Sequence, residues 1–175
     1  MGVLLSMQLG PTCTVSLQSL DRNPRPSLAI VALYPGCVDR NTLESFYSVP
    51  FLFVLAEKDD NTPVATCKQQ SEWMNGRGGR TEWKQLVGEH HDFDAPYRLA
   101  RSARTENPSK CGNLRDRGTF TLDATGKQYP GTPEGFSAMR KDCLSMSGRG
   151  VTGGNQGDPR TGFDVWTAFF AEHLR

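Results

Sequence analysis

Two continuous apolar runs, each of strand length, constrain the fold of this 175-residue chain more than any other feature. The first is Leu28–Tyr34 (LAIVALY), which a Pro-Gly turn closes, and the second is Phe51–Leu55 (FLFVL), which follows a proline. A strand that is apolar on both faces is typical of a parallel sheet that helices cover on both sides. The sequence therefore predicts an α/β protein.

The elements around these runs support a parallel sheet. A helix is predicted over Pro63–Gly76, since proline suits a first helical turn and Thr62 lies near the cap. A glycine-rich turn at Arg77–Arg80 then ends the helix, and Trp83–Val87 alternates as a third strand. We therefore predict three parallel strands with flanking helices, in a single domain over residues 1–175.

The rest of the chain is less regular. The apolar cluster Gly2–Leu9 predicts a short buried helix. Residues 97–157 are rich in polar residues and glycine and show no long apolar period, so we expect a long irregular insert. Within it we expect a short helix near Pro133–Leu144 and a loop at Gly148–Gly157. An amphipathic helix with Asp158 as a plausible cap closes the chain.

Composition excludes several classes of function. The formal net charge is +1, from 20 basic and 19 acidic residues, so no basic excess is present to meet nucleic-acid phosphates. The longest apolar run, Phe51–Ala56, is far shorter than the ~20 residues that a membrane helix needs. The first basic residue is Arg22, so the charged region of a signal peptide is missing, which favours a cytoplasmic location.

The five cysteines are scattered, and no CxxC pair predicts a structural zinc site. In a reducing cytosol all five are thiols, whereas an oxidising compartment allows one or two bridges. A bridge between Cys37 and Cys67 is conceivable, because both residues lie just beyond strand-end turns. An odd count leaves at least one thiol free if all pairing is internal.

Two polar turns carry the candidate chemistry. Glu57–Pro63 follows the second strand and Gly88–Asp94 follows the third. Because ligands and catalytic groups gather at the carboxyl ends of parallel strands, an Asp of the first turn and a His of the second can pair. Such a carboxylate fixes the imidazole tautomer and stabilises the imidazolium. From the turns alone, Asp59 or Asp60 and His90 or His91 remain open.

Three strings make the pattern specific: IVALYPGC, VPFLFVLAEKDDNTP and VGEHHDFDAP. Together they resemble the dienelactone hydrolase family of α/β-hydrolases. The family's strand-end motif Gly-x-x-Asp-x-x-(Thr/Val)-Pro falls on Asp59, although Ala56 replaces its glycine. The later motif Gly-x-x-His-x-Phe matches Gly88, His91 and Phe93, which puts the catalytic histidine on His91.

The resemblance covers residues 1–96 and about 150–175, where the closing string resembles the family's last helix. It implies a partial α/β-hydrolase fold, formed by the C-terminal parallel strands. It also implies hydrolysis of a small-molecule ester or lactone by a nucleophile, with His91 as base and Asp59 as its partner. No metal or organic cofactor is implied.

The nucleophile has no counterpart in the chain. The family places a Ser or Cys in a Gly-x-Nuc-x-Gly elbow, and no such pentapeptide occurs. Met1 and Gly2 resemble the last two elbow positions, so on this alignment the nucleophile, an oxyanion N–H and half of the sheet precede the sequence. Ser6, Cys13 and Cys37 are weaker substitutes.

Two explanations follow from the missing elbow. The first is a fragment of a hydrolase, which we favour because both partner turns are intact. The second is an inactive remnant that binds a partner through strand edges left exposed by the missing half-sheet.

Overall fold

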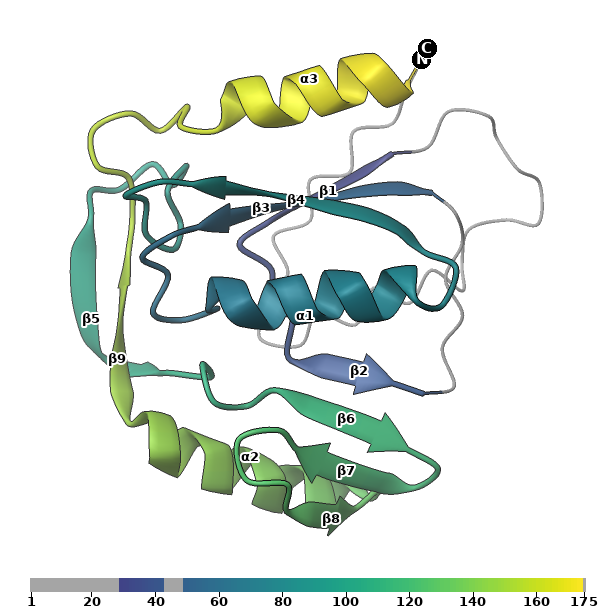
Figure 1. The fold of residues 1–175 in the computed structure, drawn as a ribbon. Coiled ribbons are helices and arrows are strands. Elements are labelled where there is room, and N and C mark those ends of the chain that lie inside the picture. Colours follow the sequence, from purple (N-terminus) through teal and green to yellow (C-terminus); the bar gives the residue numbers. More distant parts are fainter. Residues whose placement is uncertain (1–28, 43–48, 175) are drawn as a thin grey trace.

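The computed structural model describes residues 29–42 and 49–174 (Figure 1). Within them the chain forms nine strands and three helices. In chain order these are β1 (Ile30–Leu33), β2 (Asp39–Asn41), β3 (Pro50–Ala56), α1 (Val64–Asn75), β4 (Arg80–Leu86), β5 (Ala100–Glu106), β6 (Asn113–Asp116), β7 (Thr119–Leu122), β8 (Gln128–Pro130), α2 (Pro133–Ser147), β9 (Arg149–Gly153) and α3 (Phe163–His173).

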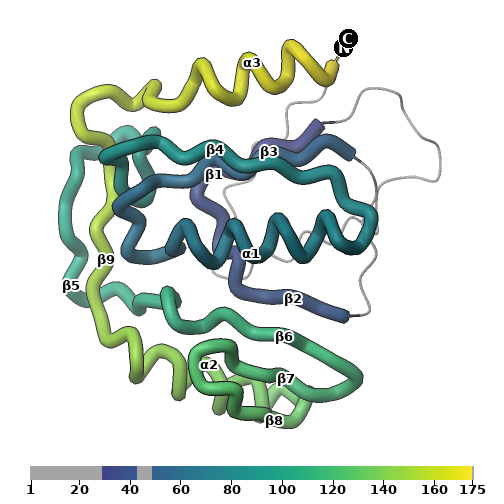
Figure 2. Tube along the Cα trace, in the orientation of Figure 1, coloured from purple at the N-terminus to yellow at the C-terminus, as the bar shows by residue number. Residues whose placement is uncertain are grey.

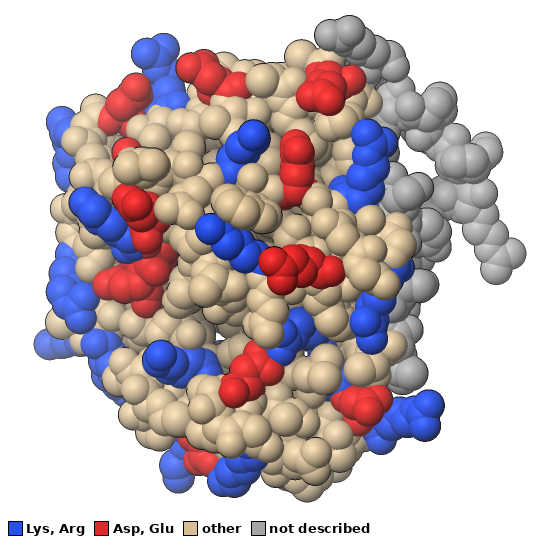
Figure 3. Space-filling view, in the orientation of Figure 1, with Lys and Arg blue, Asp and Glu red and all other residues tan. Residues whose placement is uncertain are grey.

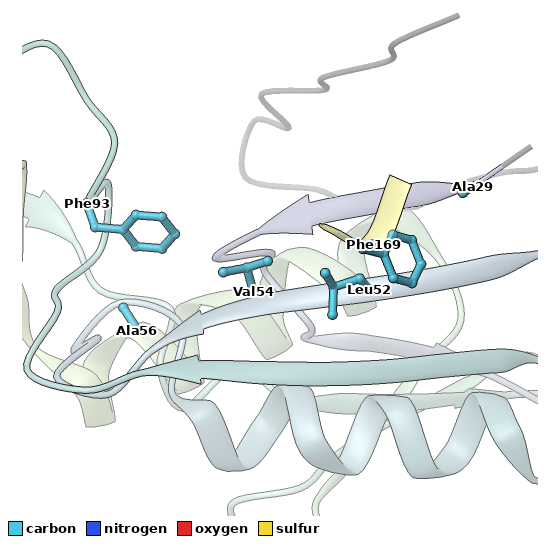
Figure 4. Close-up of a cluster of buried hydrophobic side chains, with 6 residues drawn as sticks. All are labelled: Ala29, Leu52, Val54, Ala56, Phe93 and Phe169. Atoms are coloured by element: carbon cyan, nitrogen blue, oxygen red, sulfur yellow. The ribbon is translucent and has the colours of Figure 1, made fainter. Parts of the chain in front are cut away.

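The three predicted strands form one parallel sheet in the order β1-β3-β4. Figure 1 shows α1 on one face of this sheet and α3 on the other. Side chains of the central strand alternate between the two faces: Leu52 and Val54 pack in the cluster that includes Phe169 of α3 (Figure 4). Phe51, Phe53 and Leu55 pack in the cluster on the α1 side. Burial on both faces explains why the run is apolar throughout.

The prediction of an irregular insert over residues 97–157 is wrong. The segment contributes β6, β7 and β8 to a mixed sheet of order β2-β6-β7-β8, and β5 and β9 form an antiparallel ribbon. Helix α2, predicted near Pro133–Leu144, covers β7 and β8. The expected loop at Gly148–Gly157 begins with β9 instead. Strands β6, β7, β8 and β9 are three to five residues long, so any alternation in them was too brief to detect.

The last helix begins later than predicted. Gly162, not Asp158, is the N-cap residue of α3. The Asp158 carboxylate instead accepts a hydrogen bond from the Arg160 N–H at 2.9 Å, within the preceding turn. Gly162 has a φ of 80°, and a Cβ atom there would lie 2.9 Å from the Leu86 Cδ1 atom. A glycine is therefore required where α3 meets the end of β4.

The described residues form two disulfides. Cys37–Cys67, which the sequence suggested, joins the segment after β1 to α1. Cys111–Cys143, which the sequence did not suggest, joins the segment before β6 to α2. None of the described helices is long and apolar enough to cross a membrane. The predicted N-terminal helix Gly2–Leu9 lies outside the described residues.

The insert has a small core of its own, so its disulfide contributes much of its stability. The core consists of six buried residues, which are Cys111, Phe120, Leu122, Tyr129, Met139 and Cys143. The bridge closes a loop with a sequence separation of 32 residues. Constraining a loop of this length stabilises a fold by about 3–4 kcal/mol in the chain-entropy model.

We therefore expect the Cys111→Ala/Cys143→Ala variant to lose about 3–4 kcal/mol of unfolding free energy, measured by urea denaturation. The matched control is Cys37→Ala/Cys67→Ala, whose bridge spans a nearly equal separation of 30 residues. The chain-entropy model predicts similar losses for both. An unchanged denaturation midpoint in the first variant would contradict the bridge.

Candidate functional site

The two polar turns leave the sheet side by side. Ala56 and Leu86, the last residues of β3 and β4, are partners in the parallel register. Beyond them the Glu57 N–H donates to the Leu86 carbonyl at 3.1 Å, and the Lys58 N–H donates to the Glu89 carbonyl at 2.8 Å. The segments Glu57–Pro63 (the aspartate turn) and Val87–Asp94 (the histidine loop) therefore start from one edge of the sheet.

Asp59 and His91 meet between these segments. The distance between the Asp59 Oδ2 atom and the His91 Nδ1 atom is 2.8 Å. Asp59 also accepts hydrogen bonds from the Asn61 and Thr62 N–H groups at 2.9 and 2.7 Å, and from the Thr62 hydroxyl at 2.8 Å. Its side chain is 1% exposed. Four donors thus hold a buried carboxyl group in one orientation.

This arrangement decides which acid pairs with His91. Asp60, the sequence neighbour, directs its carboxylate to Thr152 instead. Thr62, which was expected near the cap of α1, donates its hydroxyl to Asp59, and Pro63 occupies the N-cap position.

The second histidine of the loop takes no part in the pair. The Nδ1 atom of His90 is buried and has no hydrogen-bond partner among the described residues. The imidazole that the turn geometry selects is therefore His91.

Asp59 and its neighbours set the protonation of His91. Burial of the ring acts to lower the pKa, because it disfavours the charged form. The hydrogen bond to Asp59 and the negative charges of Asp59, Asp92 and Asp60 act in the opposite direction and together prevail. The pKa of His91 is therefore raised above its ordinary value, and the imidazolium is stabilised at this position.

The other imidazole nitrogen faces Asn61. The Asn61 Nδ2 atom lies 3.0 Å from His91 Nε2, and Asp92 Oδ1 lies 3.7 Å from the same nitrogen. Since Nδ1–H donates to the Asp59 carboxylate, the hydrogen-bond network assigns a lone pair to Nε2 that accepts from the Asn61 amide. The sequence analysis missed Asn61, although its place two residues after Asp59 was a signal for it.

Tyr34 forms a wall of the site. Its ring lies edge-on to His91 with the centroids 4.7 Å apart, and its hydroxyl donates to Asp94 at 2.8 Å. Burial and this hydrogen bond raise the pKa of Tyr34. Tyr97 donates to Asp92, and burial together with that bond raises the pKa of Tyr97 to about 12.

Residues 29–42 and 49–174 place no Ser or Cys side chain at hydrogen-bonding distance from the His91 ring, whose partners there are Asp59, Asn61 and Thr62. Cys37 is bonded to Cys67, which removes it as a candidate. Ser6 and Cys13 lie outside the described residues. The same residues contain no group of three or more His, Cys, Asp or Glu side chains that could hold a metal ion.

Comparison with protein-family models, with curated proteins and with solved structures finds no match. The site must therefore be interpreted from its own geometry. That geometry supplies a general base with its orienting carboxylate, a pair that can move a proton to or from a group placed at Nε2.

We expect Asp59→Asn to lower the pKa of His91, because the substitution removes the negative charge that favours the imidazolium and leaves only a neutral amide oxygen as acceptor. An NMR titration of the His91 ring protons measures this change. The control is Glu57→Gln in the same turn, since Glu57 hydrogen-bonds the Gly88 N–H and not the imidazole. Equal midpoints in wild type and Asp59→Asn would contradict the pairing.

The raised pKa also makes stability depend on pH. A group whose pKa is higher in the folded state stabilises the fold fully below its unfolded value, about 6.5 for histidine, and this contribution disappears as the pH rises through the folded value. The wild type should therefore exceed His91→Gln in unfolding free energy most at low pH. Denaturant titrations from pH 5.5 to 9 measure the difference. A difference that grows with pH would be inconsistent with the sign of the shift.

Proposed function

We propose that this chain is the C-terminal part of a hydrolase of the dienelactone hydrolase type, acting on ester or lactone bonds of a small molecule. The observation that carries the proposal is the 2.8 Å contact between Asp59 and His91, made by turns that follow neighbouring parallel strands. The resemblance of both turns to the family's motifs supports it. So does the chain order of Asp before His, which α/β-hydrolases share.

The dyad supplies two of the three groups that the reaction needs. In the proposed mechanism a Ser or Cys from outside the described residues attacks the carbonyl carbon, and His91 Nε2 takes its proton. Asp59 holds the Nδ1–H tautomer and stabilises the imidazolium. The C–O bond to the leaving alcohol then breaks as His91 returns the proton to that oxygen. Water, activated by His91, hydrolyses the acyl-enzyme and regenerates both groups.

During this cycle Asn61 has to break its hydrogen bond to His91 Nε2. Its amide now donates to the nitrogen that must accept the nucleophile's proton. Because an amide carries both a donor and an acceptor, the side chain can turn its oxygen to Nε2–H once His91 is protonated. The contact is therefore compatible with a base that alternates between two protonation states.

The inactive remnant remains the rival proposal, and one observation favours it. Among the described residues β1 pairs only with β3, so its other edge lies at the border of this sheet. An unpaired edge is a template for another strand. A partner that binds this edge would not need the proton-transfer geometry of Asp59 and His91, which is why we rank the hydrolase first.

The test compares the 175-residue chain with the product of the same gene read in frame upstream of Met1, using p-nitrophenyl acetate. We expect an upstream Gly-x-(Ser/Cys) and turnover by the longer protein. His91→Gln should reduce kcat by at least about 10⁴-fold and Asp59→Asn by about 10³–10⁴-fold. His90→Gln is the matched control and should retain the wild-type rate.

Two results would change the proposal. A stop codon directly upstream, with no His91-dependent turnover by the chain, would overturn the hydrolase in favour of the remnant. His91-dependent turnover by the 175-residue chain itself would place the nucleophile within it. Loss of that turnover in Ser6→Ala or Cys13→Ala would then identify the nucleophile.

A further inference from the structure

The insert contacts the aspartate turn directly at Asp60. The Thr152 N–H of β9 donates to Asp60 Oδ1 at 2.7 Å, and the Thr152 hydroxyl donates to Oδ2 at 2.9 Å. These residues are 92 positions apart in the chain. Asn107, 8% exposed, adds a bond from its amide to the Asp60 carbonyl at 2.9 Å and another to the Gly150 carbonyl at 3.2 Å. The ribbon of β5 and β9 is thus fixed to Asp60, the residue beside Asp59.

The end of the same strand contacts the histidine loop. Gly153 forms a parallel bridge with His91, and the Gly154 N–H donates to the His91 carbonyl at 2.8 Å. A Cβ atom at Gly153 would lie 3.1 Å from the His91 carbonyl oxygen. At Gly154, which has a φ of 115°, a Cβ atom would lie 2.5 Å from the Arg98 carbonyl oxygen. Gly154 therefore needs glycine, whereas a side chain at Gly153 would require the His91 backbone to shift by a few tenths of an ångström.

The loop after β9 extends this contact. The Gln156 amide donates to the Gly88 carbonyl at 2.8 Å and to Glu89 Oε2 at 3.0 Å. Asn155 donates to the carbonyls of Ala95 and Tyr97, each at 2.8 Å. Figure 2 shows β9 running from α2 toward the ends of β3 and β4. Strand β9 and the loop after it therefore contact both the aspartate turn and the histidine loop.

We propose that Asp60 is a positioning residue: by binding Thr152 it docks the insert on the aspartate turn, and the docked β9 holds the His91 loop at hydrogen-bonding distance from Asp59. The proposal rests on the proposed function only in calling this dyad catalytic. Rates of proton transfer fall steeply with misplacement of about 1 Å, so a strand that fixes both turns has a direct chemical effect.

Charge and docking have to be separated, because Asp60 influences His91 in both ways. The charged groups that face His91 are Asp59 and Asp60 from the aspartate turn and Asp92 from its own loop. Arg101 of β5 pairs with Asp60 Oδ2 at 3.2 Å. Figure 3 shows basic and acidic side chains interspersed over the face of the molecule seen in the orientation of Figure 1. Any neutral replacement of Asp60 removes one of the three carboxylates. A replacement without a side-chain oxygen also removes the contact to Thr152.

Three variants make this separation. Asp60→Asn removes the charge but keeps an oxygen that accepts from the Thr152 N–H. Asp60→Ala removes both the charge and the contact. Thr152→Val keeps the charge of Asp60 and removes only the hydroxyl donor. Asp142→Asn is the control within the insert, because Asp142 binds Lys127 and Tyr129 and not the dyad.

The readouts are the His91 pKa and the exchange rate of its Nδ1–H with water, both by NMR, with the melting temperature recorded in parallel. We expect a lower pKa in Asp60→Asn with nearly wild-type exchange. In Asp60→Ala the pKa should be lower still and the exchange about five- to tenfold faster, as for loss of one net hydrogen bond. Thr152→Val should also speed the exchange, and Asp142→Asn should change only the melting temperature.

Equal exchange rates in Asp60→Ala and Asp60→Asn, with Thr152→Val like wild type, would overturn the proposal and leave Asp60 a purely electrostatic neighbour. If Asp60→Ala fails to fold, the exchange rate of the His91 Nδ1–H in Thr152→Val alone tests the proposal. None of these readouts requires a nucleophile. If these variants speed the exchange but the longer gene product has no esterase activity, the positioning role of Asp60 holds and the hydrolase is refuted. If the longer product is an active esterase but the variants leave the exchange unchanged, the hydrolase holds and the positioning role is refuted.

Discussion

The parallel pairing of β3 with β4 brings the two turns of the site to one edge of the sheet, because the last residues of the strands, Ala56 and Leu86, are partners in register. Burial enforces this pairing. Leu52, Val54 and Ala56 are each at most 1% exposed, so removing β3 from its place would expose an apolar strand on both faces. The position of the Asp59–His91 pair is thus determined by the core rather than by the turns themselves.

The turns add orientation to this position. A side chain at a strand end still has freedom to rotate, and the hydrogen bonds to Asp59 from Asn61 and Thr62 remove it. His91 is held in turn by Asp59 at Nδ1, by Asn61 at Nε2 and by the Tyr34 ring edge-on. Three carboxylates around one imidazole stabilise its charged form, which is the form that a general base reaches after accepting a proton.

Sequence reasoning succeeded where a local pattern carried the information. The run Phe51–Leu55 predicted a buried parallel strand, and the helix after it was placed to within two residues at each end. The choice of Asp59 and His91 needed the resemblance, since two adjacent acids and two adjacent histidines are indistinguishable by residue type. The structure brings this pair together through contacts between segments that are 32 residues apart.

The insert escaped prediction because long-range contacts define it. All seven residues of β5 are exposed, so the strand has no apolar alternation to detect. Its partner β9 lies about fifty residues further on, with Ala100 opposite Gly153. Arg40 of β2 likewise forms an ion pair with Asp123 across 83 residues. Such pairings leave no periodic trace in either segment, and only the folded arrangement reveals them.

The two disulfides indicate the redox state of the compartment in which this protein is stable. The insert core is small, and the bridge at Cys111 and Cys143 lies inside it, so a reduced insert would be held together by few buried side chains. The second bridge fixes Cys37, three residues after the site residue Tyr34. Bridges of this kind persist in oxidising compartments and are rare in the cytosol. The structure therefore favours an oxidising compartment over the cytoplasmic location expected from the sequence.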